Sequence, residues 1–271
     1  MKIQFMPLDV DAVTRLIREV AEAEILPRFN RLAEGESWEK RTGSIVTIAD
    51  ERAEAALGVG LAAIRPGARV VGEEACEADP GILRALEEPG AVWIVDPVDG
   101  TANFADGKPC FAVMVALVVD GRTTAGWIYD PIAGAMSVAE RGAGAWRDGV
   151  RLSVAPAVAE TEMTGALGAR LRRDVAFSGR FAGVTNNKCC GVDYQALGAG
   201  TSHFAFYRGL KPWDHAPGQL LHHEAGGFNA CLDGSPYAPG RKHQEGLLMA
   251  PDEPTWHALA RDIRIVLADK T

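Results

Sequence analysis

Apolar residues near the N-terminus recur at helical intervals. Across residues 10–20 they fall every three or four positions, which is typical of one face of an amphipathic helix. Asp9 or Asp11 is suited to cap its start, and Pro27 is expected to kink or end it. The chain therefore begins its regular structure with a surface helix.

The next part of the chain combines one helix with two short strands. A helix that opens at Asp50 is predicted to stop at Pro66-Gly67. Arg69–Val71 is predicted to be a strand ending at Gly72-Glu73-Glu74, and Val92–Val95 is predicted to be a second strand.

The second of these strands delivers two acidic residues to its end. Asp96 and Asp99 lie on either side of Pro97, three positions apart, so they cannot share one face of a regular strand. They converge if the backbone turns between them, and such carboxylates repel each other unless a cation such as Mg²⁺ joins them. The N–H groups of Gly100 and Thr101 can hold an anion if a helix or nest begins there. Together these features predict a phosphoryl-transfer site.

A different pattern follows, with short apolar runs separated by turn residues. It predicts a β-meander over 111–154, and the segment 155–180 has no clear core pattern. We therefore expect a domain boundary near residue 154, with an N-terminal α+β domain of residues 1–153 and a C-terminal α/β domain of residues 154–271. The predicted strands of the meander are Ala112–Val119, Ala125–Ile128 and Ala135–Val138.

Three further acidic residues stand at the ends of predicted elements. Glu73 ends a strand and Asp50 opens a helix. Asp214 opens a later helix, which closes at Gly226-Gly227 and carries Pro217 in its first turn. Taken singly, Asp50 and Asp214 are more often helix caps and Glu73 a solvated strand end, so the functional interpretation depends on all of them together.

Composition narrows the class of protein. The chain has 271 residues, 47% hydrophobic and 24% charged, with a net charge of −8. The acidic balance argues against a general nucleic-acid binder. Five cysteines without a CxxC pair fit a reducing compartment, and the longest apolar run is too short to cross a bilayer. We expect a cytoplasmic protein with no membrane or nucleic-acid partner.

Taken together, the motifs carry a family resemblance. They occur in a compatible order over most of the chain, and only residues 160–187 match weakly. On these motifs the chain resembles the inositol monophosphatase superfamily of metal-dependent, lithium-sensitive phosphatases. The matching segments are Val46-Thr47-Ile48-Ala49-Asp50, Gly72-Glu73-Glu74, Asp96-Pro97-Val98-Asp99-Gly100-Thr101-Ala102-Asn103-Phe104, Trp213-Asp214-His215-Ala216-Pro217-Gly218, Glu224-Ala225-Gly226-Gly227 and Asp233-Gly234-Ser235-Pro236-Tyr237.

The resemblance implies a set of metal ligands. It places Glu73, Asp96 and the carbonyl of Val98 on a first ion. It places Asp96, Asp99 and Asp214 on a second ion. Two or three Mg²⁺ ions per site and inhibition by Li⁺ are the corresponding expectations.

The resemblance also implies catalytic and phosphate-binding roles. Asp50, Thr101 and Glu73 form the catalytic set, in which Asp50 pairs with Thr101 and the Thr101 hydroxyl positions the attacking water. The N–H groups of Gly100 and Thr101 receive phosphate oxygens. No residue need become phosphorylated.

The substrate side departs from the family pattern. The stretch that contacts the alcohol portion of the substrate corresponds here to Lys188-Cys189-Cys190-Gly191. Inositol-specific members place a Glu six residues before the Trp of the WD motif, where this chain has Tyr207. We therefore predict that myo-inositol phosphate is not the preferred substrate, and Arg208 and Lys188 either meet a further negative group or are solvated. The expected substrate-binding residues are Asp99, Cys190, Tyr207 and Asp214.

Several histidines and cysteines have two interpretations. His215 and His222 lie seven apart on one helix face and could suggest Zn²⁺, although packing is favoured because the strong ligands are oxygens. His203 either lines the substrate pocket or is structural. Cys189-Cys190 fits buried packing better than redox chemistry.

The resemblance implies an αβαβα sandwich within the α/β class, with the metals between its halves. The predicted function is Mg²⁺-dependent hydrolysis of a small phosphate monoester, in a protein that is expected to be a homodimer. Histidinol phosphate, fructose 1,6-bisphosphate and phosphoadenosine phosphate are alternative substrates within the superfamily. A regulatory binding protein on the same fold, or a glycosidase using Asp96 and Asp99 as acid and base, are the alternatives from other classes.

Overall fold

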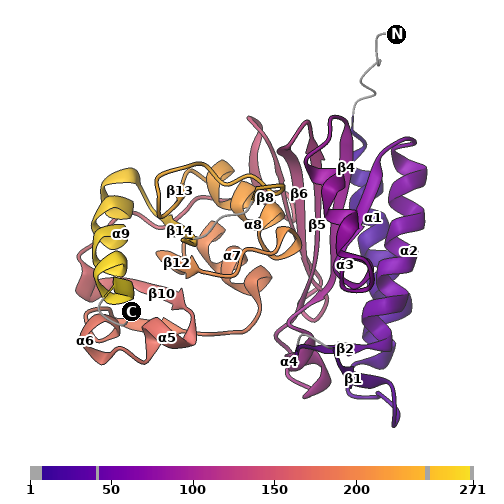
Figure 1. Cartoon of the computed structure of the whole chain (residues 1–271), viewed down its shortest axis with the longest axis horizontal. Helices are drawn as coiled ribbons and strands as arrows, with labels where there is room; N and C mark the ends of the chain where they lie inside the picture. Colours follow the sequence, from indigo (N-terminus) through magenta and orange to yellow (C-terminus); the bar gives the residue numbers. More distant parts are fainter. Residues whose placement is uncertain (1–7, 41–42, 242–244, 269–271) are drawn as a thin grey trace.

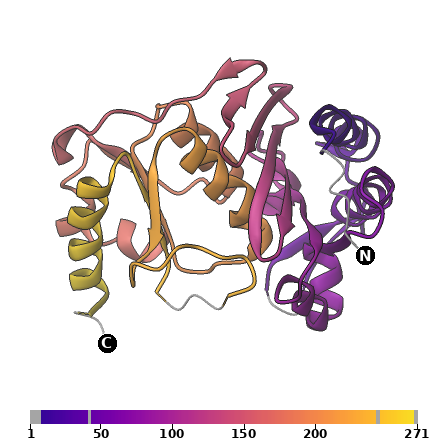
Figure 2. The same ribbon diagram turned by 90° about the horizontal axis from the view of Figure 1, so that it is seen from above.

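The computed structural model describes residues 8–40, 43–241 and 245–268. Five layers follow one another across the molecule (Figures 1 and 2): the helices α1 and α2, a seven-stranded sheet, the helices α7 and α8, a five-stranded sheet, and α9. This arrangement confirms the predicted αβαβα sandwich. None of the helices in the described part of the chain has the length and apolar character needed to span a membrane.

The outer helices of the first layer begin at side-chain caps. Asp9 caps α1 (Val10–Val20), because its Oδ1 accepts a hydrogen bond from the N–H of Ala12 at 2.8 Å. The helix continues through a π-helical turn and a 3₁₀ turn at Leu26–Arg28, so Pro27 lies in its last turn as predicted. In α2 (Ile48–Ile64) the N-cap is Thr47.

The seven-stranded sheet contains the predicted meander. Its order along the sheet is the order along the chain, and only the first pair is parallel. The strands are β3 (Arg69–Gly72), β4 (Ala91–Asp99), β5 (Ala112–Val119), β6 (Arg122–Asp130), β7 (Ala135–Glu140), β8 (Gly144–Arg147) and β9 (Val150–Arg151).

Both faces of this sheet are buried. In β4, Trp93 and Val95 belong to the core shared with α1 and α2, whereas Val92 and Ile94 pack with Trp213 of α8. Two-sided burial explains why β4 is a continuous apolar run without polar alternation.

The end of β4 differs from the sequence prediction. The strand does not stop at Val95 but runs through Asp99, with an irregularity in its pairing. Asp96 pairs with Met114 and Asp99 pairs with Ala112, so β4 advances three residues while β5 advances two. One extra residue is a β-bulge, and it restores the phase of the pleat. The bulge, and not a turn, therefore brings Asp96 and Asp99 to the same face.

The second sheet lies farther along the chain, and the domain boundary at residue 154 remains a prediction. Its strand order is β11-β10-β12-β14-β13, with α7 and α8 on one face and α9 on the other. The elements are β10 (Thr164–Leu167), α5 (Ala169–Arg172), α6 (Val175–Ser178), β11 (Gly183–Thr185), α7 (Cys190–Gly198), β12 (Phe204–Tyr207), α8 (Pro212–Glu224), β13 (Phe228–Cys231), β14 (Leu247–Ala250) and α9 (Glu253–Ala268).

The helix α8 begins at Pro212, two residues before Asp214. Pro217 lies in the second turn rather than the first. A proline there has no N–H for the helical ladder, so packing must hold the helix together. Gly126 of β6 allows this packing, because a Cβ atom there would lie 2.8 Å from Pro217 Cα.

Candidate active site

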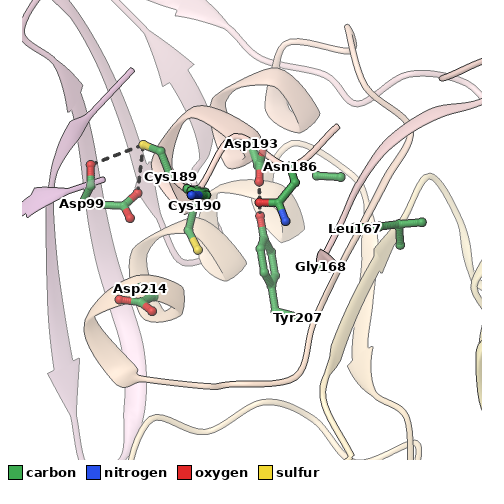
Figure 3. A pocket seen from close by; sticks show the side chains of 11 residues that line it. Asp99, Leu167, Gly168, Asn186, Cys189, Cys190, Asp193, Tyr207 and Asp214 are labelled. Atoms are coloured by element: carbon green, nitrogen blue, oxygen red, sulfur yellow. Dashed lines mark hydrogen bonds between the residues drawn. The ribbon is translucent and has the colours of Figure 1, made fainter. Parts of the chain in front are cut away.

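Two adjoining cavities lie between the halves of the molecule. One, of about 260 Å³, is lined by the residues at the end of β4, by Glu73 and by Asp214. The other, of about 270 Å³, extends toward β10 and β12 and includes Cys190 and Tyr207 (Figure 3). Asp99, Lys188 and Asp214 line both. We call the first the acidic cavity and the second the side cavity.

Three carboxylates from distant stretches of sequence meet in the acidic cavity. Glu73 is the first residue of α3 (Glu73–Ala78), Asp96 lies near the end of β4, and Asp214 is the third residue of α8. Each offers an oxygen, and these oxygens lie within 4.8 Å of one another. Burial and then the charge of Glu73 raise the pKa of Asp96, while burial and then the charge of Asp99 raise the pKa of Asp214. Such a cluster is suited to a hard cation.

Asp99 lies in the same cavity but is held from the other side. Its Oδ2 accepts hydrogen bonds from the N–H of Gly191 at 2.5 Å and from the thiol of Cys189 at 3.2 Å. Burial raises the pKa of Asp99 to about 6, although these hydrogen bonds lower it. Asp99 is therefore the link between β4 and the start of α7.

Asp50 is not the N-cap of its helix, which is Thr47, but it completes the capping box with that residue. It is the third residue of α2, and its Oδ2 accepts hydrogen bonds from the N–H and the hydroxyl of Thr47 at 2.9 and 2.5 Å. Its Oδ1 accepts from the hydroxyl of Thr101 at 2.9 Å, and the carbonyl of Val98 lies at the same distance from that hydroxyl. Burial raises the pKa of Asp50 to about 6. The pairing of Asp50 with Thr101 is thus present in the structure.

Gly100 makes the turn that follows β4. Its φ of +92° lies in the left-handed region, and a Cβ atom there would be 2.8 Å from the carbonyl oxygen of Cys110. Only glycine fits both constraints. The next residue, Thr101, begins the short helix α4 (Thr101–Ala105), and both residues line the acidic cavity.

Two residues that support Glu73 were missed in the sequence analysis. The ammonium of Lys40 donates to Oε1 of Glu73 at 2.8 Å and to Oε1 of Glu74 at 2.7 Å. Glu54 accepts from the N–H groups of Glu74 and Ala75, both at 2.8 Å, and so fixes the start of α3. Glu54 lies four residues after Asp50 on α2, a spacing that could have identified it. No comparable sequence spacing points to Lys40.

Two histidines of α8, His215 and His222, are buried inside the protein, whereas His223 is exposed. Of the two ring nitrogens of His215, Nδ1 lies 3.1 Å from the hydroxyl of Tyr194 and Nε2 lies 2.9 Å from the carbonyl of Gly209. Burial lowers the pKa of His215 to about 4 and that of His222 to about 3. Both His215 nitrogens already have partners, which favours packing over zinc binding. His203 Nδ1 accepts from the N–H of Thr164 at 3.1 Å.

Comparison with known proteins establishes the family of this chain. A model of the inositol monophosphatase family matches residues 4–267. The chain belongs to the inositol monophosphatase family. An inositol-1-monophosphatase from Mesorhizobium japonicum is 34% identical over 216 residues, which cover 72% of this chain and 75% of that relative. The protein named Nus factor SuhB of Escherichia coli K12 is 31% identical over 209 residues, covering 73% and 76%.

Solved structures of this family share the fold. The Thermotoga maritima IMPase superposes with a TM-score of 0.82 at 24% identity and covers 96% of this chain and 98% of its own. A structure of the extragenic suppressor protein suhB from Bartonella henselae gives a TM-score of 0.76 at 26% identity, covering 92% and 97%. The family resemblance predicted from the motifs is confirmed. One of these relatives is named as an enzyme, an inositol-1-monophosphatase, and another as a factor, Nus factor SuhB.

Proposed function

We propose that the protein is a Mg²⁺-dependent phosphatase that hydrolyses a small phosphate monoester. The observation that carries this proposal is the acidic cavity, where Glu73, Asp96 and Asp214 bring ligand oxygens within 4.8 Å of one another. Asp99 lines the same space, as do Gly100 and Thr101. Every ligand that the family resemblance requires is thus present around one cavity.

The donor set fits magnesium. All the converging side chains are carboxylates, and burial together with mutual repulsion raises the pKa values of Asp96 and Asp214. Hard cations prefer such oxygens. Glu73, Asp96, Asp99, Asp214 and the carbonyl of Val98 would hold the ions. When bound, Mg²⁺ supplies charge neutralisation for the phosphate and lowers the pKa of water.

The protein's own groups would position the nucleophile and the phosphate. The Thr101 hydroxyl is held by Asp50 at 2.9 Å, so it can pass its proton to Asp50 while it accepts one from the attacking water. Thr47 fixes the orientation of Asp50 by two hydrogen bonds. The N–H groups of Gly100 and Thr101 would receive phosphate oxygens. In this scheme Asp50 is the terminal proton acceptor.

A regulatory role is the second candidate, since several relatives carry the name Nus factor SuhB. The complete carboxylate set favours catalysis, because a protein that acts only through its surface does not need four acidic residues around one cavity. That the protein is cytoplasmic, is a homodimer, is inhibited by Li⁺ and does not bind nucleic acid remain predictions.

Phosphate release from a panel of phosphate monoesters tests the proposal. We expect turnover with Mg²⁺, loss of turnover in EDTA, and inhibition by Li⁺. Asp99→Asn should lose most of the activity. Turnover that persists in EDTA would point instead to acid–base chemistry by Asp96 and Asp99, and an absence of turnover on every ester would favour the regulatory role.

A further inference from the structure

Two cysteines from distant segments of the chain meet behind the turn at Gly100. Cys110 lies just before β5 and Cys189 just before α7, and both are free thiols. A Cβ atom on Gly100 would lie 2.8 Å from the carbonyl oxygen of Cys110 and 3.2 Å from the Cβ atom of Cys189, so both cysteines adjoin the same point. Their side chains also form a hydrogen bond with each other.

The backbone around both cysteines is held by one amide. Nδ2 of Asn103 donates to the carbonyl of Cys110 at 2.9 Å and to that of Asn187 at 2.8 Å. The thiol of Cys110 donates to the same Asn187 carbonyl at 3.7 Å. Nδ2 of Asn187 donates in turn to Asp193, which lines the side cavity, at 2.6 Å. Cys110 is thus fixed beside the segment that carries Cys189.

The neighbour of Cys189 in the sequence, Cys190, faces elsewhere. Figure 3 shows the sulfur of Cys189 directed at Asp99 and the sulfur of Cys190 directed away from it. The sulfur of Cys190 lies within 4.8 Å of a carboxylate oxygen of Asp214. The fold therefore favours Cys110, and not the adjacent cysteine, as the partner of Cys189.

A bond between the two sulfurs would change the contacts of Asp99. The thiol of Cys189 lies 3.2 Å from Oδ2 of Asp99 and 3.4 Å from its carbonyl oxygen. A disulfide has no S–H group to donate, so Asp99 would lose this hydrogen bond and keep that of the Gly191 N–H. The disulfide would also form against Gly100, where there is no space for an added Cβ atom. Both changes act at residues proposed to bind metal and phosphate.

The more accessible thiol would react first with an oxidant. Cys110 is half-buried, whereas Cys189 is 2% exposed, and the hydrogen bond with Cys189 lowers the pKa of the Cys110 thiol. The Cys110 thiolate attacks an oxygen of hydrogen peroxide, which gives a sulfenic acid and hydroxide, and the hydroxide takes up the released thiol proton as water. Cys189 then attacks the sulfur of Cys110, the S–O bond breaks, and the oxygen leaves as water with the proton of Cys189. Two thiols and one peroxide thus give one disulfide and two waters.

We propose that Cys110 and Cys189 form a redox modification site, in which peroxide joins the two thiols reversibly and thereby lowers the activity of the acidic cavity. Cys110 is the thiol that peroxide oxidises, and Cys189 is the thiol that closes the disulfide. The loss of activity rests on the proposed phosphatase function, whereas the formation of the disulfide does not.

Peptide mapping by mass spectrometry tests the proposal. The reduced protein is treated with hydrogen peroxide in Mg²⁺, and its remaining thiols are alkylated under denaturing conditions. We expect a disulfide between Cys110 and Cys189, a loss of activity of about tenfold or more, and recovery in dithiothreitol. Cys110→Ser should form no such disulfide and lose less than about twofold of its activity in peroxide. Cys231→Ala, in β13, is the matched control and should respond as wild type does.

Two further measurements keep the test decisive. In Cys189→Ser no thiol can close the disulfide, so dimedone, which traps sulfenic acids, should label Cys110 after peroxide treatment. Mg²⁺ should raise the melting temperature of the reduced wild type more than that of the oxidised wild type, which reports on the metal site without turnover.

Three results would overturn the inference: no disulfide, a disulfide between Cys189 and Cys190, or a Cys110–Cys189 disulfide that leaves both activity and the response to Mg²⁺ unchanged. If the reduced protein hydrolyses no phosphate ester, the phosphatase proposal is wrong, while the peptide map and the melting temperatures still decide this inference.

Discussion

The two cavities contain carboxylates in opposite situations. In the acidic cavity, Asp96 and Asp214 face other acidic groups, and burial together with this repulsion raises their pKa values. In the side cavity, Asp193 is buried and accepts hydrogen bonds from two neutral donors, Tyr207 and Asn187. Burial raises the pKa of Asp193 as well, but its two hydrogen bonds lower it, whereas in the acidic cavity the neighbouring charges add to the effect of burial.

The carboxylates of the two cavities are therefore stabilised in different ways. The acidic residues are held together by the elements that carry them, since α3, β4 and α8 pack through one apolar cluster that includes Cys76, Ile94 and Trp213. This packing offsets the repulsion in the absence of metal. The acidic cavity should therefore respond to metal and pH, whereas the side cavity should respond to the loss of individual hydrogen bonds.

The largest expected effect is that of Asp96→Asn, which removes a charge from the acidic cavity. Activity with Mg²⁺ should fall on the order of 100-fold or more, because a ligand shared by the ions is lost. The metal-free protein should melt at a higher temperature than wild type, because one source of repulsion is gone. Phosphate release and thermal unfolding in EDTA measure the two effects. Near wild-type turnover would show that Asp96 does not bind metal.

Replacing Thr101 tests the proton path next to the metal site. Thr101→Val removes the hydroxyl that Asp50 holds at 2.9 Å, and kcat should fall by about 100-fold with KM nearly unchanged. Thr101→Ser keeps the hydroxyl and should remain within about tenfold of wild type. Steady-state kinetics on one phosphate ester separates the two parameters. Equal losses in both variants would show that the methyl group, and not the hydroxyl, is important.

The pH dependence of stability should differ with and without metal. Burial raises the pKa of both Asp50 and Asp99 from 3.8 to about 6, so the folded state binds more protons than the unfolded state between these values. The stability of the metal-free protein should therefore fall as pH rises from about 4 through 6, by up to about 3 kcal/mol per group. Mg²⁺ should raise the melting temperature more at pH 8 than at pH 5, and an equal increase would contradict this account.

The smallest effect is expected for Glu54→Gln, which weakens the hydrogen bonds to the first N–H groups of α3. The free energy of unfolding should fall by about 1–2 kcal/mol, because the charged acceptor of two amides becomes neutral. Activity should fall only a fewfold through a shift of Glu73. Glu51→Gln, three residues earlier and exposed, is the matched control. Chemical denaturation of both variants provides the comparison. Equal losses of unfolding free energy in the two variants would show that Glu54 does not support the site.

Much of the acidic cavity could be predicted from sequence because its residues lie at the ends of recognisable elements. Asp96 and Asp99 follow an apolar run, and the glycine that turns the chain follows them directly. The predicted strand end at Val95 is nevertheless too early, because the sequence does not show that β4 continues through a bulge at residues 96–99 opposite β5. Asp50 was likewise assigned to the start of its helix, although Thr47 is the cap.

The supporting residues could not be predicted because their partners are distant in sequence. Lys40 lies 33 residues from Glu73, and the thiol of Cys189 meets Asp99 across 90 residues. Asp193 is one of several acidic residues in helices, and only the return of β12 beside α7 brings Tyr207 to it. Such pairs depend on how the fold brings distant elements together, which short motifs do not encode.

The bulge in β4 has a consequence for how this cleft can change during evolution. Side-chain direction alternates at every residue of a strand, so inserting or deleting one position between Asp96 and Asp99 would send one of them to the opposite surface of the sheet. Substitutions elsewhere along β4 only alter packing. The interval between these two acids should thus tolerate no change of length, even in lineages where the residues of the side cavity have diverged completely.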